Sequence, residues 1–519
     1  MRRSSLFWVL MVAVAIVAGA LRLSRLSQRP LHTDEAVHAV KFGMLLEDGD
    51  YEYDPNEYHG PTLNYATLLI AKLRGQSTYV GLDEYTLRLV PAFFGWVLVF
   101  LPLALRPLWD HRSIGLLCLF TAISPAFVYY SRYYIMEIML VCFTFGMIVS
   151  IFRYLRSSKL GWMVCAGLCA GLMHATKETC VLAFACMALA GALTRWMPGP
   201  RPDWPATVKP LHLGVAIAVA VVTSALFFSS FGTHQQGVLD SYQTYTTYLH
   251  RAGQGGANHH HGFFYYLDLL TWIELLEWPP WNEDLTVVLA LLGCYWALRR
   301  RTGPALLRFM AFYTLLMTLV YSFISYKTPW CMLGFLHGML FLAAYAMSDW
   351  MRRDGGNWTR RVLWVVLLLF GVASPLAQAV CLNFVYQAEP GNPYVYAHTT
   401  RDIFYVEQRV RAAARAHPDG NDMYVQVICP GHDAWPLPWY LRDMNGIGYW
   451  SEVDMNAPVS DVFICQAEVV AQLVERLYER RPPGQRELYL PLFERTVQLR
   501  PGVELRAYIR KGLYDQLEP

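Results

Sequence analysis

Long apolar runs recur through the first three quarters of the chain and are separated by short polar segments. A helix needs about 20 mostly apolar residues to cross the hydrocarbon core of a bilayer. Runs of about this length lie at 6–24, 86–105, 113–131, 134–152, 160–175, 179–196, 211–231, 285–298, 304–324, 330–348 and 361–383. We therefore predict a polytopic α-helical membrane protein with about eleven transmembrane helices, of which the runs near 165 and 290 are the shortest.

The first run follows MRRSS and resembles the core of a signal peptide. It lacks a clear A-x-A cleavage site, and LRLSRLSQRP follows it directly. We expect an uncleaved first transmembrane helix.

The segments between the runs alternate in character. One set is short and basic, and includes MRRSS, FRYLRSSK and LRRRTG; by the positive-inside rule these face the cytoplasm. The other set is acidic, aromatic and rich in histidine, and it includes residues 25–84 and 232–284. We expect a multi-pass protein of the cytoplasmic (inner) membrane, with a cytoplasmic amino terminus and with the second set of loops outside.

The chain changes character after about residue 385, where short apolar runs alternate with polar ones. AEVVAQLVERLYERR has the spacing of an amphipathic helix. We predict a transmembrane domain over 1–384 and a small extracytoplasmic α/β domain over 385–519, here called the tail domain. Cys429 and Cys465 end two of its predicted strands, and both a disulfide and two buried thiols remain open.

Composition agrees with this division. The chain is 55% hydrophobic and only 16% charged, whereas about a quarter of a soluble protein is charged. Its net charge is +3, and its Arg and Lys residues fall in small groups at the ends of apolar runs. We therefore expect membrane lipids, and no nucleic acid, among its partners.

Two adjacent carboxylates, Asp34 and Glu35, lie close to the end of the first run, in LHTDEAVHAV. An aspartate beside an acceptor hydroxyl can act as a general base. The loop continues YEYDPNEYHGPTLNY, in which Tyr58 and His59 suit the floor of a polar pocket. On pattern alone either carboxylate could be the base.

Charged residues also mark three later segments on the predicted outer side. Arg132 and Glu137 flank the start of the fourth run, and interfacial packing of the arginine among tyrosines is the alternative to a functional role. The other charged or aromatic residues are Lys177 and Glu178 in HATKE, and Lys327 and Trp330 in YKTPW. Charges between spans are costly without a partner. Three cations on one side predict a site for a lipid phosphate.

The loop before residue 285 contains three consecutive histidines, His259, His260 and His261. Consecutive histidines cannot all point at one metal ion, and no fixed spacing to Glu274 or Glu277 defines a metal motif. GQGGANHHHG is typical of a mobile loop that closes over substrate. FFYYLDLLTWIELLEW predicts an amphipathic helix lying on the membrane.

Six motifs in this order carry a resemblance: HTDEAVHA, YDPNEYHGPTLNY, SRYYIME, TKE, YKTPW and WPLPWYLRD. Together they resemble a prokaryotic family of GT-C-like proteins labelled flippase activity-associated. More broadly, the chain resembles the GT-C superfamily of membrane glycosyltransferases, which includes protein O-mannosyltransferases and lipid A aminoarabinose transferases. The resemblance covers nearly the whole chain.

The resemblance implies transfer of a sugar from a polyprenyl-phosphate donor to a glycan, lipid or protein acceptor at the outer face, with inversion. It implies that Asp34 is the catalytic base, which leaves Glu35 to hold a loop amide, a metal or a basic partner. It also implies that Glu137 is the second acidic residue and that Arg132 and Lys177 hold the donor phosphate. Members differ in their need for a divalent metal, which leaves the metal open. The chain lacks a WWD signature, which argues against transfer of whole oligosaccharides to asparagine.

Two other functions remain alternatives. A transporter or flippase of lipid-linked sugars would favour inverted repeats and polar residues in the cytoplasmic half of the spans. The sequence shows no such repeat and few such residues. A non-catalytic scaffold of an envelope glycan assembly complex would not need Asp34, Arg132 and Lys177 together.

Overall fold

The computed structural model describes residues 2–56, 59–197, 208–252, 260–271, 283–300, 304–353 and 355–517. Every apolar run predicted to cross the membrane is helical. The corresponding helices are α1 (Arg2–Leu23), α4 (Glu84–Phe100), α5 (His111–Ile123) with α6 (Pro125–Ser131), α7 (Glu137–Ser157), α8 (Leu160–His174), α9 (Cys180–Trp196), α10 (Pro210–Phe228), α13 (Asp284–Arg299), α14 (Ala305–Phe323), α15 (Leu333–Arg352) and α16 (Trp358–Val380).

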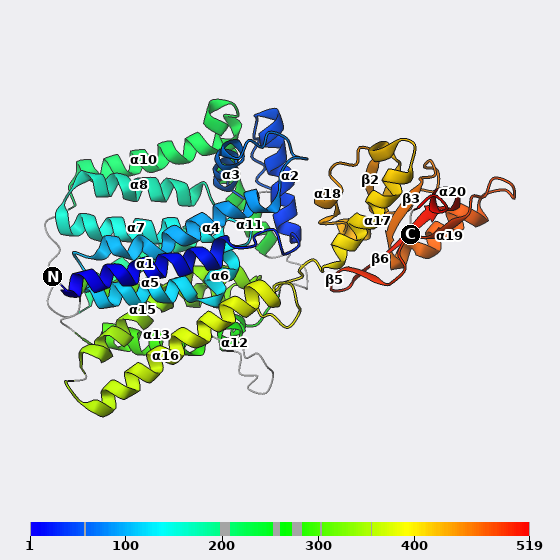
Figure 1. Cartoon of the computed structure of the whole chain (residues 1–519). Helices are drawn as coiled ribbons and strands as arrows, with labels where there is room; N and C mark the ends of the chain where they lie inside the picture. The colour runs from blue at the N-terminus through cyan, green and yellow to red at the C-terminus, as the bar shows by residue number, and fades with distance from the viewer. Residues whose placement is uncertain are drawn as a thin grey trace.

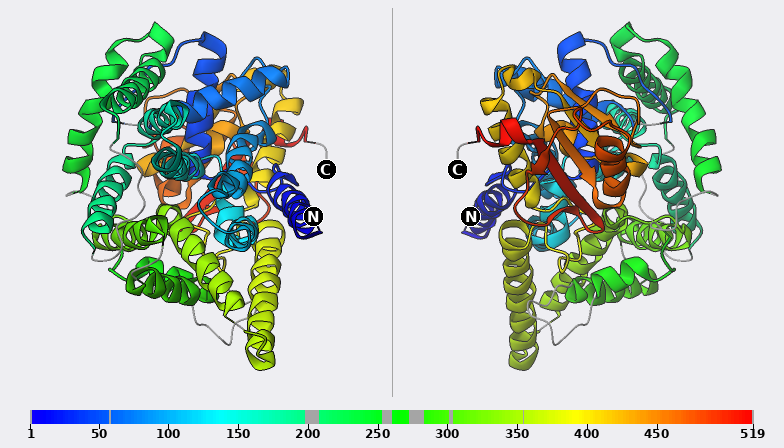
Figure 2. Two further views of the ribbon diagram at one scale, coloured as in Figure 1. Left: turned by 90° about the vertical axis from the view of Figure 1, so that its left-hand side faces the viewer. Right: turned by 90° about the vertical axis from the view of Figure 1, so that its right-hand side faces the viewer.

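These helices form one bundle of a multi-pass membrane protein. Among the described helices, 7 are long and apolar enough to cross a membrane, or 8 if α5 and α6 count as one bent span. Helices α8 and α9 are apolar but shorter. The total of about eleven spans therefore stays a prediction. Helices α10 and α16 lie at the edges of the bundle, with most of their surface exposed (Figures 1 and 2).

The loops predicted to face outward gather at one end of the bundle, beside the tail domain, and we call this the tail end (Figure 1). Helices α2 (Thr33–Asp48), α3 (Thr62–Leu73) and α11 (Gln236–Ala252) lie there, whereas the amino terminus lies at the opposite end. Where FFYYLDLLTWIELLEW predicts an amphipathic helix, the structure has α12 (Tyr265–Leu270), and residues 272–282 lie outside the described part.

A break between α5 and α6 bends this pair of helices by 59°. Ser124 and Pro125 begin α6, and the Ser124 side chain caps it by accepting from the N–H of Phe127. The buried guanidinium of Arg22 donates to the carbonyl oxygens of Thr121 and Ala122, at 2.8 Å each. These carbonyls end α5 and have no partner within the helix. The arginine therefore stabilises a broken span that directs the following segment toward the tail end.

The tail domain is an α/β fold, as predicted. Its strands β1 (Val425–Ile428), β2 (Ile447–Trp450) and β3 (Val462–Gln466) are parallel, in the order β2-β1-β3. Strand β6 (Val503–Arg510) pairs antiparallel with β3, and β4 (Tyr489–Pro491) and β5 (Val497–Arg500) pair with β6. All residues of β1 and β3 are buried, so these strands form the centre of the domain.

Helices cover this sheet and connect its strands. They are α17 (Asp402–Ala416), α18 (Leu437–Tyr440), α19 (Val470–Val474) and α20 (Lys511–Tyr514). Helix α19, with the single turns Ala467–Val469 and Glu475–Glu479 that flank it, confirms the helix predicted from AEVVAQLVERLYERR. Cys429 and Cys465 are free, buried thiols in this structure.

Candidate active site

Asp34 lies in the first turn of α2. His32 is the N-cap of this helix: its Nδ1 accepts from the N–H of Asp34 at 3.1 Å, and its own N–H donates to Glu35 at 3.0 Å. Such a capping box satisfies the amide groups that begin a helix. The Asp34 side chain is 42% exposed, whereas that of His32 is 5% exposed. The carboxylate predicted to be the base is therefore accessible and stands on a rigid turn.

Glu35 is fully buried, and both of its carboxylate oxygens accept hydrogen bonds. Arg88 donates two hydrogen bonds of 2.7 Å to its two oxygens, and Arg29 donates at 3.3 Å. The N–H of Tyr134 donates to it at 2.8 Å. Burial alone would raise the pKa of Glu35, but the two arginines outweigh it and lower the pKa to about 2. The structure gives Glu35 both loop amides and basic partners, which favours a positioning role over direct catalysis.

Arg88 is a residue of the candidate site that sequence reasoning missed. Besides Glu35, it donates to the carbonyl oxygens of Leu26, Arg29 and Pro30. It thereby ties the segment after α1 to the start of α4. The signal was present, because an arginine inside an apolar run requires a partner.

Lys177 and Glu137 form an ion pair at the tail end of the bundle. The Lys177 Nζ lies 2.5 Å from Glu137 Oε1, and the two side chains are 9% and 7% exposed. Both residues line a cavity between α7, α9, α14 and α15, together with Tyr321 and Trp330. The motifs SRYYIME, TKE and YKTPW, separated in the sequence, therefore meet at one place. The second oxygen of Glu137 has no hydrogen-bond partner among the described residues.

A histidine–carboxylate pair stands beside Lys177. Nδ1 of His59 lies 3.0 Å from Oε2 of Glu178, which is buried. Burial would raise the pKa of Glu178, but His59 and Lys177 lower it to about 2. The ring of His38 lies 6.2 Å from that of His59. Burial lowers the pKa of His38 to about 4, and His59, Asp34 and Lys177 all lie close enough to influence it. The accessible carboxylate of Asp34 and the buried ammonium of Lys177 therefore both lie near His38.

Arg132 and Lys327 are bound to the backbone instead. Arg132 donates to the carbonyl oxygens of Leu21 and Arg22, in the last turn of α1, and of Ser24 and Arg25, just after it. Lys327 donates to the carbonyl oxygens of Ser322 and Ile324, which end α14. Cations commonly satisfy the carbonyl groups and the dipole at helix carboxyl ends. These contacts favour structural roles, and phosphate binding by either residue stays a prediction.

The histidines of the loop before residue 285 are candidate metal ligands, and the structure describes two of the three. Among the residues that the structure describes, no three His, Cys, Asp or Glu side chains are grouped so that they could hold a metal ion. His260 forms a β-bridge with Tyr326, and the ring of His261 stacks on Tyr265 at 4.1 Å. Tyr58, His259 and most of GQGGANHHHG lie outside the described residues. The need for a divalent metal therefore stays open.

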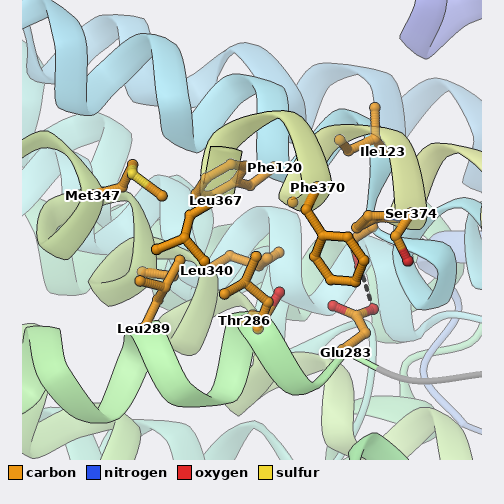
Figure 3. Close-up of a pocket in the computed structure, with 15 residues that line it drawn as sticks. Phe120, Ile123, Glu283, Thr286, Leu289, Leu340, Met347, Leu367, Phe370 and Ser374 are labelled. Carbon is orange, nitrogen blue, oxygen red and sulfur yellow. Dashed lines mark hydrogen bonds between the residues drawn. The ribbon is translucent and has the colours of Figure 1, made fainter. Parts of the chain in front are cut away.

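A separate cavity lies between α5, α13, α15 and α16 (Figure 3). Apolar side chains line most of it, and Glu283 stands at one end. Glu283 accepts from Ser124 Oγ at 2.7 Å, at the start of α6. Neither Asp34 nor Lys177 lines this cavity, so it is distinct from the candidate active site.

A known protein family matches part of the chain. Residues 58–228 match the family described as dolichyl-phosphate-mannose-protein mannosyltransferase. No curated protein matches the chain in a sequence search.

Solved structures resemble nearly the whole chain. The apo crystal structure of ArnT from Cupriavidus metallidurans superposes with a TM-score of 0.65 and 16% identity, over 97% of this chain and 98% of that one. The same protein bound to undecaprenyl phosphate gives a TM-score of 0.64 at 16% identity, over 96% and 98%.

The archaeal oligosaccharyltransferase AglB from Archaeoglobus fulgidus, in complex with an inhibitory peptide and a dolichol-phosphate, gives a TM-score of 0.57 at 11% identity. That match covers 92% of this chain and 71% of the other. At these identities the similarity to the solved structures concerns the fold. The matching family and the similar structures are membrane glycosyltransferases. The chain therefore shares the fold of these membrane glycosyltransferases over nearly its whole length, and residues 58–228 match the mannosyltransferase family.

Proposed function

We propose that the protein transfers a sugar from a polyprenyl-phosphate donor to a glycan, lipid or protein acceptor at the outer face of the cytoplasmic membrane. The observation that carries this proposal is that the accessible carboxylate of Asp34 and the buried Lys177–Glu137 pair lie at the same end of the bundle, the tail end (Figure 1). The similar structures bound to undecaprenyl phosphate and to dolichol-phosphate support a lipid-linked donor of this kind.

Lys177 binds the donor phosphate in this mechanism. It lies between the end of α8 and the start of α9, and we place the phosphate of the donor lipid there. Glu137 holds the ammonium group of Lys177 in place. The imidazole of His59, oriented by Glu178, is a second group for the phosphate. Cationic groups at this position stabilise the negative charge that develops on the departing lipid phosphate.

Asp34 acts on the acceptor. Its carboxylate takes the proton of an acceptor hydroxyl, whose oxygen attacks the anomeric carbon of the donor sugar from the face opposite the phosphate. The bond from that carbon to the phosphate oxygen breaks as the new glycosidic bond forms. The proton remains on Asp34, the bonding electrons leave with the polyprenyl phosphate, and the configuration of the sugar inverts.

Lys177→Ala is expected to weaken polyprenyl-phosphate binding by about 1–3 kcal/mol, because a charge-assisted hydrogen bond in a desolvated site is lost. Binding of undecaprenyl phosphate to the purified protein measures this effect. Lys72→Ala, which removes an exposed lysine of α3, is the matched control. The single variant leaves Glu137 without its ion pair, so the double variant Lys177→Met/Glu137→Gln keeps the site neutral. Unchanged lipid binding by either folded variant would refute this donor site.

A further inference from the structure

The three residues before Asp34 are each held by the tail domain. The N–H of Leu31 donates to the hydroxyl of Tyr440 at 2.8 Å. Its carbonyl oxygen accepts from Thr399 Oγ1 at 2.7 Å. Leu31 is fully buried. Both backbone groups at the entrance to α2 are therefore bound by side chains from the other domain.

His32 continues this connection through its ring. Nε2 lies 2.9 Å from the carbonyl oxygen of Tyr396, and Nδ1 accepts from the N–H of Asp34. A carbonyl oxygen can only accept, so Nε2 carries the proton and Nδ1 is the acceptor. One neutral imidazole therefore connects the backbone of the tail domain to the backbone of Asp34.

Thr33 provides the third contact. Its Oγ1 accepts from Arg500 at 2.9 Å, and the same guanidinium donates to the carbonyl oxygen of Trp435 at 3.1 Å. Asp433 forms an ion pair with Arg500, whose side chain is 13% exposed. Arg500, at the end of β5, is therefore held by two groups of its own domain, Trp435 and Asp433, while it contacts Thr33.

We infer that the tail domain positions the catalytic carboxylate: through Tyr440, Thr399, Tyr396 and Arg500 it fixes the turn from which Asp34 projects. This inference rests on the proposed function for its effect on transfer. Positioning matters because a displacement of about 1 Å between reacting groups can cost about a hundredfold in rate. The lipid phosphate site at Lys177 receives none of these four contacts, so loosening the turn should slow transfer without weakening donor binding.

Other contacts between the domains do not touch this turn and provide a control. Arg442 of the tail domain donates to the carbonyl oxygen of Leu82 at 2.7 Å, and Trp439 Nε1 donates to Glu84 at 2.9 Å. These contacts attach the tail domain at the start of α4. Arg442→Gln and Arg500→Gln each remove one guanidinium from the interface, but only the second changes a contact to Leu31–Thr33.

The experiment compares these two variants in the full-length reconstituted protein. Arg500→Gln is expected to reduce kcat by about tenfold or more, with undecaprenyl-phosphate binding within about twofold of wild type. Hydrogen exchange at the amides of residues 33–36 should also accelerate. Arg442→Gln should leave both the rate and this exchange within about twofold of wild type. Thr33→Val, which removes only the acceptor, should follow Arg500→Gln and serves if that variant does not fold.

Equal effects of Arg500→Gln and Arg442→Gln on kcat and exchange would refute the inference, because general docking would then explain both. Unchanged exchange in both Arg500→Gln and Thr33→Val would refute it as well. The exchange measurement needs no turnover. Faster exchange in Arg500→Gln alone would therefore support the contact even if the wild-type protein transferred no sugar, a result that would refute only the proposed function.

Discussion

Asp34→Asn is expected to lower the rate of sugar transfer by about 100- to 10,000-fold, the usual effect of losing a general base. Asparagine keeps the shape of the side chain and cannot accept the acceptor's proton. The amide contact to His32 involves the backbone and therefore remains. Because the phosphate site at Lys177 is separate, binding of undecaprenyl phosphate should stay close to that of the wild type.

Asp48→Asn is the matched control, since Asp48 is an exposed carboxylate at the other end of α2. It should leave transfer unchanged. A fully active Asp34→Asn protein would remove Asp34 from catalysis and leave the transporter or the scaffold as the better description.

Glu35→Gln is expected to destabilise the folded protein by about 3–5 kcal/mol, the range observed when one partner of a buried ion pair is removed. Two guanidinium groups, those of Arg88 and Arg29, would lose their counter-charge inside the bundle. Unfolding of the purified protein measures the loss. Glu47→Gln, an exposed position on the same helix, should change the stability by less than about 0.5 kcal/mol. Wild-type stability in Glu35→Gln would contradict this role.

The ion pairs of Glu35 with Arg88 and Arg29 also predict how the stability of the folded protein depends on pH. The pKa of Glu35 falls from its usual 4.5 to about 2 in the folded protein, so its ionised form favours folding. Its contribution is present above about pH 4.5 and is lost as the pH falls toward 2. The difference in stability between wild type and Glu35→Gln should therefore shrink over this window and stay constant above it.

The sequence predicted the local features of this fold well. Each apolar run is a helix in the structure. Glu137, Lys177 and Trp330, which the loop pattern predicted to lie on one side of the membrane, line one cavity. These predictions succeed because hydrophobic periodicity and span length are properties of short segments. The tail domain's strands and its helix near residue 470 followed from the same kind of pattern.

Partners far apart in the chain could not be predicted. Glu35 binds Arg88, 53 residues away, and Thr33 binds Arg500, 467 residues away. Which helix ends approach Arg132 and Lys327 depends on how the bundle packs, and a single sequence does not reveal it. Arg132 and Lys327, which the sequence analysis assigned to a lipid phosphate, therefore donate to backbone carbonyl oxygens at helix ends. For the same reason, the contacts between the tail domain and the turn before Asp34 could not be predicted.

The most direct test of the proposed function follows the bond between sugar and lipid. Reconstituted protein would receive undecaprenyl phosphate hexose, labelled in both the sugar and the lipid, with glycan, lipid and protein fractions of the native cell envelope. The proposed function predicts free undecaprenyl phosphate and labelled acceptor in equal amounts, and neither product with Asp34→Asn. Recovery of intact donor from the wild-type protein, whether or not it had crossed the membrane, would contradict it.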